Sequence, residues 1–66
     1  MIQLQVNGET RPIEAATLAQ ALLELGYHEA HVATALNGVF VAAGQRAAQR
    51  LCEGDALEIL APMQGG

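Results

Sequence analysis

Two Asn-Gly pairs, each lying between short apolar segments, constrain the fold of this 66-residue chain more than any other feature. In "MIQLQVNGE" apolar and polar residues alternate up to Val6, and this period of two indicates a strand with one buried face. Asn7-Gly8 then favours a type I′ turn, because both residues tolerate positive φ. We therefore predict a hairpin whose second strand covers residues 9–13, with Pro12 suited to a sheet edge.

The second Asn-Gly pair predicts a second hairpin in the stretch "HVATALNGVFV". A short strand precedes Asn37-Gly38, and a partner strand follows from Val39 to Val41.

A single amphipathic helix is predicted between the two hairpins, in "ATLAQALLELGY". Thr17 is a good N-cap, and Gln20 stands three residues further on, as in a capping box. Apolar residues recur at helical spacing on one face. Gly26 fits the left-handed position that ends a helix.

The last third of the chain predicts a weakly helical stretch, "AAGQRAAQRL", followed by a turn at "EGD" and a final strand, "ALEILA". In that strand Leu57 and Ile59 should face the core, while Glu58 and Leu60 should face outward. Pro62 ends the strand.

This order of elements predicts an α+β protein with the β-grasp arrangement, the fold of ubiquitin. We expect a mixed sheet of four to five strands with one main helix packed on one face. Residues 1–61 should form the β-grasp domain, and residues 62–66 a flexible C-terminal tail ending in Gly-Gly.

Size and charge exclude several functions. A chain of 66 residues has little room for a deep substrate pocket, which disfavours a free-standing enzyme. The net charge of -4, with no basic patch, argues against nucleic acid and suits a partner with a basic groove. With no signal peptide and no apolar run of membrane-spanning length, a cytoplasmic protein without a membrane partner is expected.

Few side chains offer chemistry. His28 and His31 could share a metal, but surface histidines are the simpler interpretation and no metal site is predicted. Cys52 has no partner cysteine, so we expect a buried, inert thiol. Glu53 and Asp55 are explained by turn formation.

The ending "PMQGG" is the strongest functional signal. Five residues from Pro62 extend roughly 16–18 Å, enough to enter the active site of another protein. Glycine has no Cβ, so the last two residues can pass through a narrow channel. A frayed or truncated end is the alternative. We interpret the terminal carboxylate as the reactive group, which adenylation by ATP would make a good electrophile.

The chain resembles the ubiquitin-like sulfur carrier protein family of thiamine biosynthesis. The resemblance is carried by "IQLQVNGE", "TLAQALLELG", "VATALNGVFV" and "LCEGDALEILAPMQGG", which follow the family's order and spacing over most of the chain. The stretch "AAGQRAAQR" departs from the family pattern, which is more polar there.

The resemblance implies a protein co-substrate rather than an enzyme, with no bound cofactor. An E1-like adenylating enzyme would use ATP to activate Gly66. Sulfur drawn from cysteine by a cysteine desulfurase would convert it to a thiocarboxylate, and thiazole synthase would take the sulfur into the thiazole ring. Gly65, Gln64 and Met63 would thread the partner's channel.

Docking also needs a surface. If Leu57 and Ile59 face the helix together with the valines of the 39–41 strand, Phe40 and Leu60 lie on the outer face as a possible partner surface. The alternative is that the phase is reversed, or that the 42–50 segment covers both.

Rival functions remain at this point. A sulfur carrier for molybdopterin synthesis has the same tail chemistry, although "VNGE" favours the thiamine family. A ubiquitin-like protein modifier would join Gly66 to lysines of its targets; this chain itself contains no lysine. A β-grasp interaction module with an inert tail is the third possibility.

Overall fold

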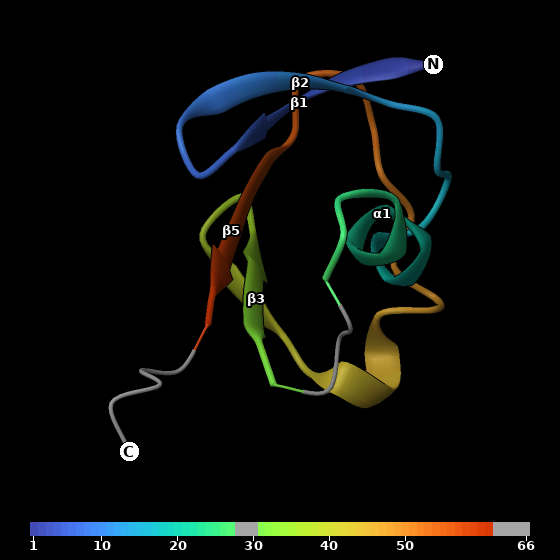
Figure 1. The fold of residues 1–66 in the computed structure, drawn as a ribbon. Helices are drawn as coiled ribbons and strands as arrows, with labels where there is room; N and C mark the ends of the chain where they lie inside the picture. Colours follow the sequence, from blue (N-terminus) through green and yellow to red (C-terminus); the bar gives the residue numbers. More distant parts are fainter. Residues whose placement is uncertain (28–30, 62–66) are drawn as a thin grey trace.

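The computed structural model describes residues 1–27 and 31–61. Within these ranges the elements follow in the order β1 (Ile2–Val6), β2 (Glu9–Ile13), α1 (Leu18–Glu24), β3 (Ala33–Leu36), β4 (Val39–Val41), the 3-10 helix η1 (Ala43–Gln45) and β5 (Ala56–Leu60). The strands form one sheet, and α1 packs against one of its faces (Figure 1). The predicted β-grasp architecture is confirmed, with five strands.

The C-terminal strand lies in the middle of the sheet. The strand order is β2-β1-β5-β3-β4. β5 runs parallel to β1 and antiparallel to β3, so the sheet is mixed. β2 and β4 are the edges, and Pro12 therefore lies on an edge strand as predicted.

Both hairpin turns have the predicted geometry. Asn7 and Gly8 have φ of 50° and 87°, and Asn37 and Gly38 have φ of 52° and 83°. Two successive positive φ values define the type I′ turn, whose twist matches that of the flanking strands. The turns thereby set the register of both hairpins.

The start of α1 confirms Thr17 as the N-cap. Its side chain accepts a hydrogen bond from the backbone N–H of Gln20 at 3.3 Å. The Gln20 side chain accepts from the N–H of Ala16 at 3.4 Å, one residue before the position that a standard capping box uses.

The end of α1 is a Schellman motif. Gly26, with φ of 94°, donates to the carbonyl of Leu23, and Tyr27 donates to the carbonyl of Leu22 at 2.8 Å. The predicted role of Gly26 is confirmed, because a left-handed residue is needed at this position.

The core lies between the sheet and α1. Its buried members all come from strands or the helix: Leu4, Val6, Ile13, Leu18, Ala21, Leu22, Leu36, Val41, Leu57 and Ile59. Val39 pairs with Leu36 and so lies on the same face of the sheet as Val41, but its side chain is 67% exposed. It stands beside the turn on β4, an edge strand.

Candidate functional site

The residues predicted to carry the chemistry lie beyond the described part of the chain. Met63, Gln64, Gly65 and Gly66 are outside the residues that the structure describes. What the structure does show is the strand that leads to them, and the surface around the end of that strand.

The end of β5 is held by a side chain from another turn. The Asn7 carboxamide accepts from the backbone N–H of Ile59 at 2.8 Å and donates to the carbonyl of Ile59 at 3.1 Å. Asn7 was predicted only as a turn residue. Its second role fixes β5 one residue before its end.

The start of β5 is held in a similar way by the other turn. The Asn37 side chain accepts from the N–H of Ala56 at 2.9 Å and donates to Oδ1 of Asp55 at 3.0 Å. Sequence reasoning missed both contacts. The available signal was the choice of asparagine, which carries a donor and an acceptor, at both turns.

The outer face of the sheet exposes the two apolar side chains expected there. Phe40 is 67% exposed and Leu60 is 70% exposed, so the alternative in which both side chains are covered does not hold. In the sheet register Phe40 pairs with Ala35, and Leu60 pairs with Ala33. β3 lies between β4 and β5, so its two alanines separate Phe40 on β4 from Leu60 on β5. Because alanine side chains are small, the apolar surface is low between the two larger side chains.

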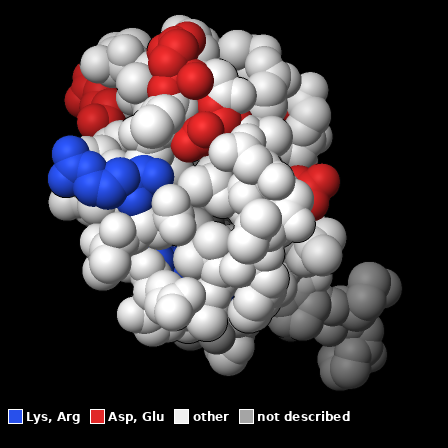
Figure 2. All heavy atoms as spheres, turned by 180° about the vertical axis from the view of Figure 1, so that it is seen from behind, with Lys and Arg blue, Asp and Glu red and all other residues white. Residues whose placement is uncertain are grey.

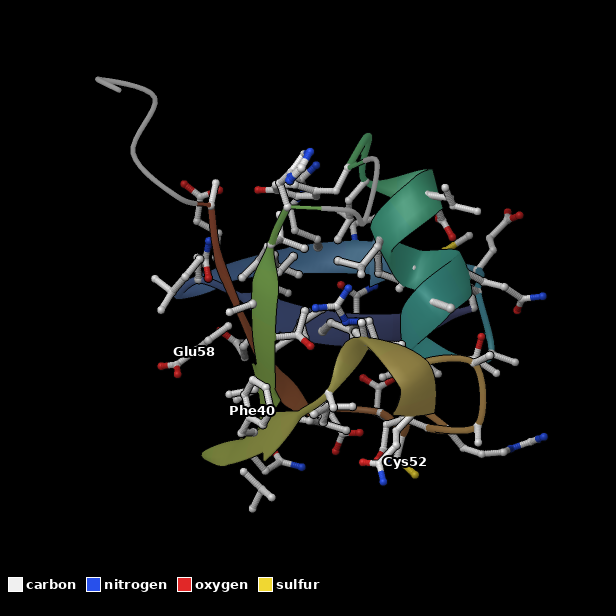
Figure 3. The ribbon with its side chains drawn as sticks, turned by 90° about the horizontal axis from the view of Figure 1, so that it is seen from below. Phe40, Cys52 and Glu58 are labelled. Atoms are coloured by element: carbon white, nitrogen blue, oxygen red, sulfur yellow. The ribbon has the colours of Figure 1, made fainter. Side chains whose placement is uncertain are left out.

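Glu58 lies beside this apolar surface. It pairs with Ala35 across β5 and β3, in the same row as Phe40. Figure 3 shows Phe40 and Glu58 projecting on the side of the sheet away from α1. The outer-face patch, defined as Phe40, Leu60, Ala33 and Ala35, therefore has an acidic neighbour.

Acidic side chains are also clustered elsewhere. In the view of Figure 2, Asp and Glu gather towards one end of the molecule, while most of the remaining face is uncharged. The acidic side chains visible in this view are therefore unevenly distributed over the face.

Cys52 corrects a prediction. We expected a buried thiol, but the side chain is exposed and lies apart from the outer-face patch (Figure 3). Leu51, the preceding residue, packs against the core, and the turn at Glu53-Gly54 follows Cys52.

The acidic pair beside Cys52 has a structural role. Asp55 accepts from the N–H of Cys52 at 2.8 Å, and Glu53 accepts from the N–H of Gln3 at 3.0 Å. Asp55 closes the turn before β5 as predicted, whereas Glu53 bonds that turn to β1.

Residues 1–27 and 31–61 contain neither a cluster of metal ligands nor a membrane-spanning helix. No group of three or more His, Cys, Asp or Glu residues gathers there as a metal site would require. His31 is exposed, while His28, its proposed companion, lies outside these ranges. No helix in the same ranges combines the length and apolar character needed to cross a bilayer.

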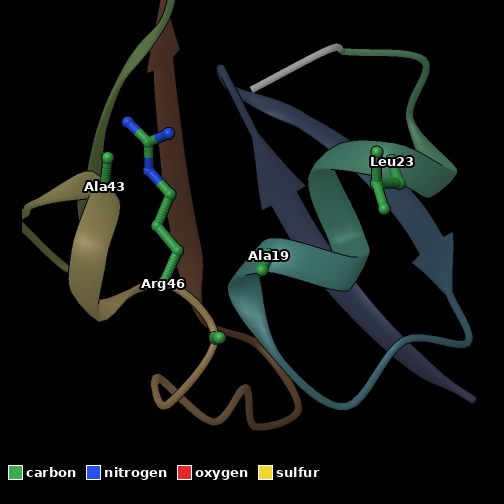
Figure 4. Close-up of a pocket in the computed structure, with 5 residues that line it drawn as sticks. Ala19, Leu23, Ala43 and Arg46 are labelled. Carbon is green, nitrogen blue, oxygen red and sulfur yellow. The ribbon is translucent and has the colours of Figure 1, made fainter. Parts of the chain in front are cut away.

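A shallow hollow of about 300 Å³ separates α1 from the segment after β4. Its lining consists of Ala19, Leu23, Ala43, Arg46 and Ala47 (Figure 4). Arg46 is buried, and its guanidinium donates a hydrogen bond to Thr34 of β3, so the charged group points into the protein and not into the hollow. The hollow offers mainly apolar contact rather than groups for chemistry.

Comparison with known proteins gives a consistent answer. The model of the ThiS family matches residues 4–66. The sulfur carrier protein ThiS of Thermus thermophilus is 39% identical over 61 residues, covering 92% of this chain and 95% of that protein. The crystal structure of the thiamine biosynthesis protein ThiS from Geobacter metallireducens has a TM-score of 0.81 and 30% identity. That alignment covers 98% of this chain and 100% of the other.

The family match spans nearly the whole chain, and the structural match confirms the β-grasp architecture. Both named relatives favour the thiamine family over molybdopterin synthesis. The chain therefore belongs to the ThiS family, whose members are sulfur carrier proteins of thiamine biosynthesis rather than enzymes.

Proposed function

We propose that Gly66 carries the sulfur as a C-terminal thiocarboxylate. An E1-like adenylating enzyme joins the Gly66 carboxylate to AMP and releases pyrophosphate from ATP. A persulfide, whose outer sulfur a cysteine desulfurase takes from cysteine, attacks the acyl carbon and displaces AMP. A thiol then reduces the resulting acyl disulfide to the thiocarboxylate. Thiazole synthase then receives the sulfur, and the carrier is recharged.

The observation that carries this proposal is the position of β5. The strand leading to residues 62–66 is central in the sheet and bonded to neighbours on both sides. A chain that leaves a rigid base can present its end to a partner at lower entropic cost. The family match also extends through Gly66.

Residues 62–66 form the reactive tail of this proposal, and residues 1–61 form the domain that presents it. Gly65 and Gly66 lack side chains and fit a narrow passage. Met63 and Gln64 contact the walls of that passage. The reaction requires a free carboxylate on Gly66, so one residue added after it stops the chemistry.

The outer-face patch is the proposed docking surface for the adenylating enzyme. Phe40 and Leu60 are large, exposed and apolar, and aromatic side chains are enriched in the cores of protein interfaces. Leu60 is the last residue of β5, so the patch borders the base of the tail.

The decisive experiment is the intact mass of the carrier after incubation with ATP, an active adenylating enzyme and a sulfide source. We expect a shift equal to the replacement of one oxygen by sulfur, absent when Gly66 is deleted. No shift with an active enzyme contradicts the proposal. Covalent adducts to lysines of other proteins would instead indicate a protein modifier.

The docking surface is tested separately with Leu60→Ala and Phe40→Ala. Both variants should raise the KM of the adenylating enzyme for the carrier. Leu23→Ala is the matched control, since Leu23 is 60% exposed on α1, away from the patch. Equal KM values for the Leu60 and Leu23 variants would reject the patch as a docking surface.

A further inference from the structure

β1 ends before its parallel neighbour β5 does. The ladder pairs Gln5 with Ala56 and Val6 with Leu57. The N–H of Asn7 still reaches the carbonyl of Leu57 at 2.9 Å. The chain then turns away, so no further backbone of β1 faces the remaining residues of β5.

The Asn7 side chain takes the place of the missing β1 backbone beside Ile59. A parallel ladder would next supply one backbone acceptor and one backbone donor to Ile59. Instead, the Asn7 Oδ1 accepts from the Ile59 N–H at 2.8 Å, and the Nδ2 donates to the Ile59 carbonyl at 3.1 Å. One planar carboxamide thus replaces a peptide unit, and β5 stays paired on its β1 side.

We infer that Asn7 is a positioning residue for the reactive C-terminus; this inference rests on the proposed function. Ile59 is the last residue of β5 with a bond to the β1 side, while Leu60 pairs with Ala33 on the other side. These two contacts set the direction in which the chain leaves the sheet. Ile59 and Leu60 therefore form the fixed base from which the segment leading to Gly66 leaves the sheet.

Asn7→Gly removes the side-chain bonds with little effect on the turn. Glycine adopts the φ of 50° found at this position, and Gly-Gly also forms type I′ turns. Asn37→Gly is a closely matched control. It has the same turn, with φ of 52°, and loses a similar pair of side-chain bonds, but at the start of β5.

The experiment compares the two variants with the parent chain in three measurements. These are the kcat of thiocarboxylate formation by the adenylating enzyme, the free energy of unfolding in urea, and amide hydrogen exchange at Ile59. Both variants should lose similar stability. Asn7→Gly should lower kcat by on the order of tenfold or more and accelerate exchange at Ile59, since small misplacements of reacting groups are costly. Asn37→Gly should change kcat much less.

Two results would overturn the inference: an unchanged kcat in Asn7→Gly, or equal losses of kcat in both variants. If Asn7→Gly does not fold, Asn7→Asp serves instead. Aspartate tolerates positive φ and keeps the acceptor for the Ile59 N–H, but loses the donor. It too should lower kcat, and an unchanged value counts against the inference. A parent chain that gains no sulfur refutes the proposed function itself, whatever Asn7 does.

Discussion

At the residue scale, Arg46 differs most from what its sequence surroundings suggest. It stands in an alanine- and glutamine-rich stretch, yet only 4% of it is exposed. Its Nε donates to Oγ1 of Thr34 at 3.1 Å, and its Nη2 donates to the Val32 carbonyl at 2.6 Å. The Thr34 hydroxyl in turn donates to the Val41 carbonyl at 2.8 Å. The guanidinium therefore bonds the segment after η1 to β3 and to the residue before it, and the Thr34 hydroxyl extends these bonds to β4.

We expect Arg46→Ala to reduce the free energy of unfolding by about 2–3 kcal/mol, because hydrogen bonds from a buried charged group are lost and their acceptors are left without that donor. Arg50→Ala is the control, since Arg50 is exposed and its loss should change stability by no more than about 0.5 kcal/mol. Urea unfolding measures both. Equal losses would show that the buried contacts of Arg46 contribute little.

At the scale of elements, β5 combines two functions through its alternation. Leu57 is fully buried, with 0% exposure, and faces the core, whereas Leu60 is 70% exposed on the opposite face. The same strand therefore anchors the fold with one set of side chains and offers a contact surface with the other. Because β5 lies between β1 and β3 in the sheet, both its inward and its outward side chains are held in fixed positions.

The two leucines of β5 should respond differently to the same substitution. Leu57→Ala should cost about 2–5 kcal/mol in unfolding free energy, because it leaves a cavity in the core. Leu60→Ala should stay within about 0.5 kcal/mol of the parent, because its side chain is mostly in water. Chemical denaturation of both variants checks this. A large loss of stability in Leu60→Ala would mean that its effect on docking cannot be separated from folding.

At the scale of the whole molecule, one core serves the entire described domain. Both hairpins, α1 and β5 contribute buried side chains to it. β1 and β5, which are far apart in sequence, lie side by side. No part of this arrangement has a separate core, so the domain should fold as one unit.

We predict a single cooperative unfolding transition with a free energy of about 3–5 kcal/mol, since a chain of this size buries limited apolar surface. Circular dichroism and the fluorescence of Tyr27, the single tyrosine, which packs against the core, should give the same midpoint in urea. Two separate midpoints would contradict a single cooperative unit. At this stability, Leu57→Ala should be partly unfolded in water.

The sequence by itself determined the hairpins, the helix ends and the inward face of β5. Each depends on local properties: the positive φ that Asn-Gly permits, the N-cap at Thr17, the left-handed Gly26, and the period of two in a strand. The same alternation allowed Phe40 and Leu60 to lie on the outer face, and both side chains are exposed in the structure. The sequence also predicts that the tail carries the chemistry, because Gly-Gly after a β-grasp strand is a distinctive ending, and this stays a prediction because residues 62–66 lie outside the described ranges.

Only the tertiary structure decided how distant segments meet. Cys52 was assigned wrongly, and Val39 is exposed although it lies on the same face as Val41, because burial depends on which elements cover a side chain and not on its own hydrophobicity. The burial of Arg46 and the contacts of Asn7 and Asn37 with β5 were not foreseen. A hydrogen bond between residues 52 positions apart requires the strands to be assembled first, and no local pattern encodes that pairing.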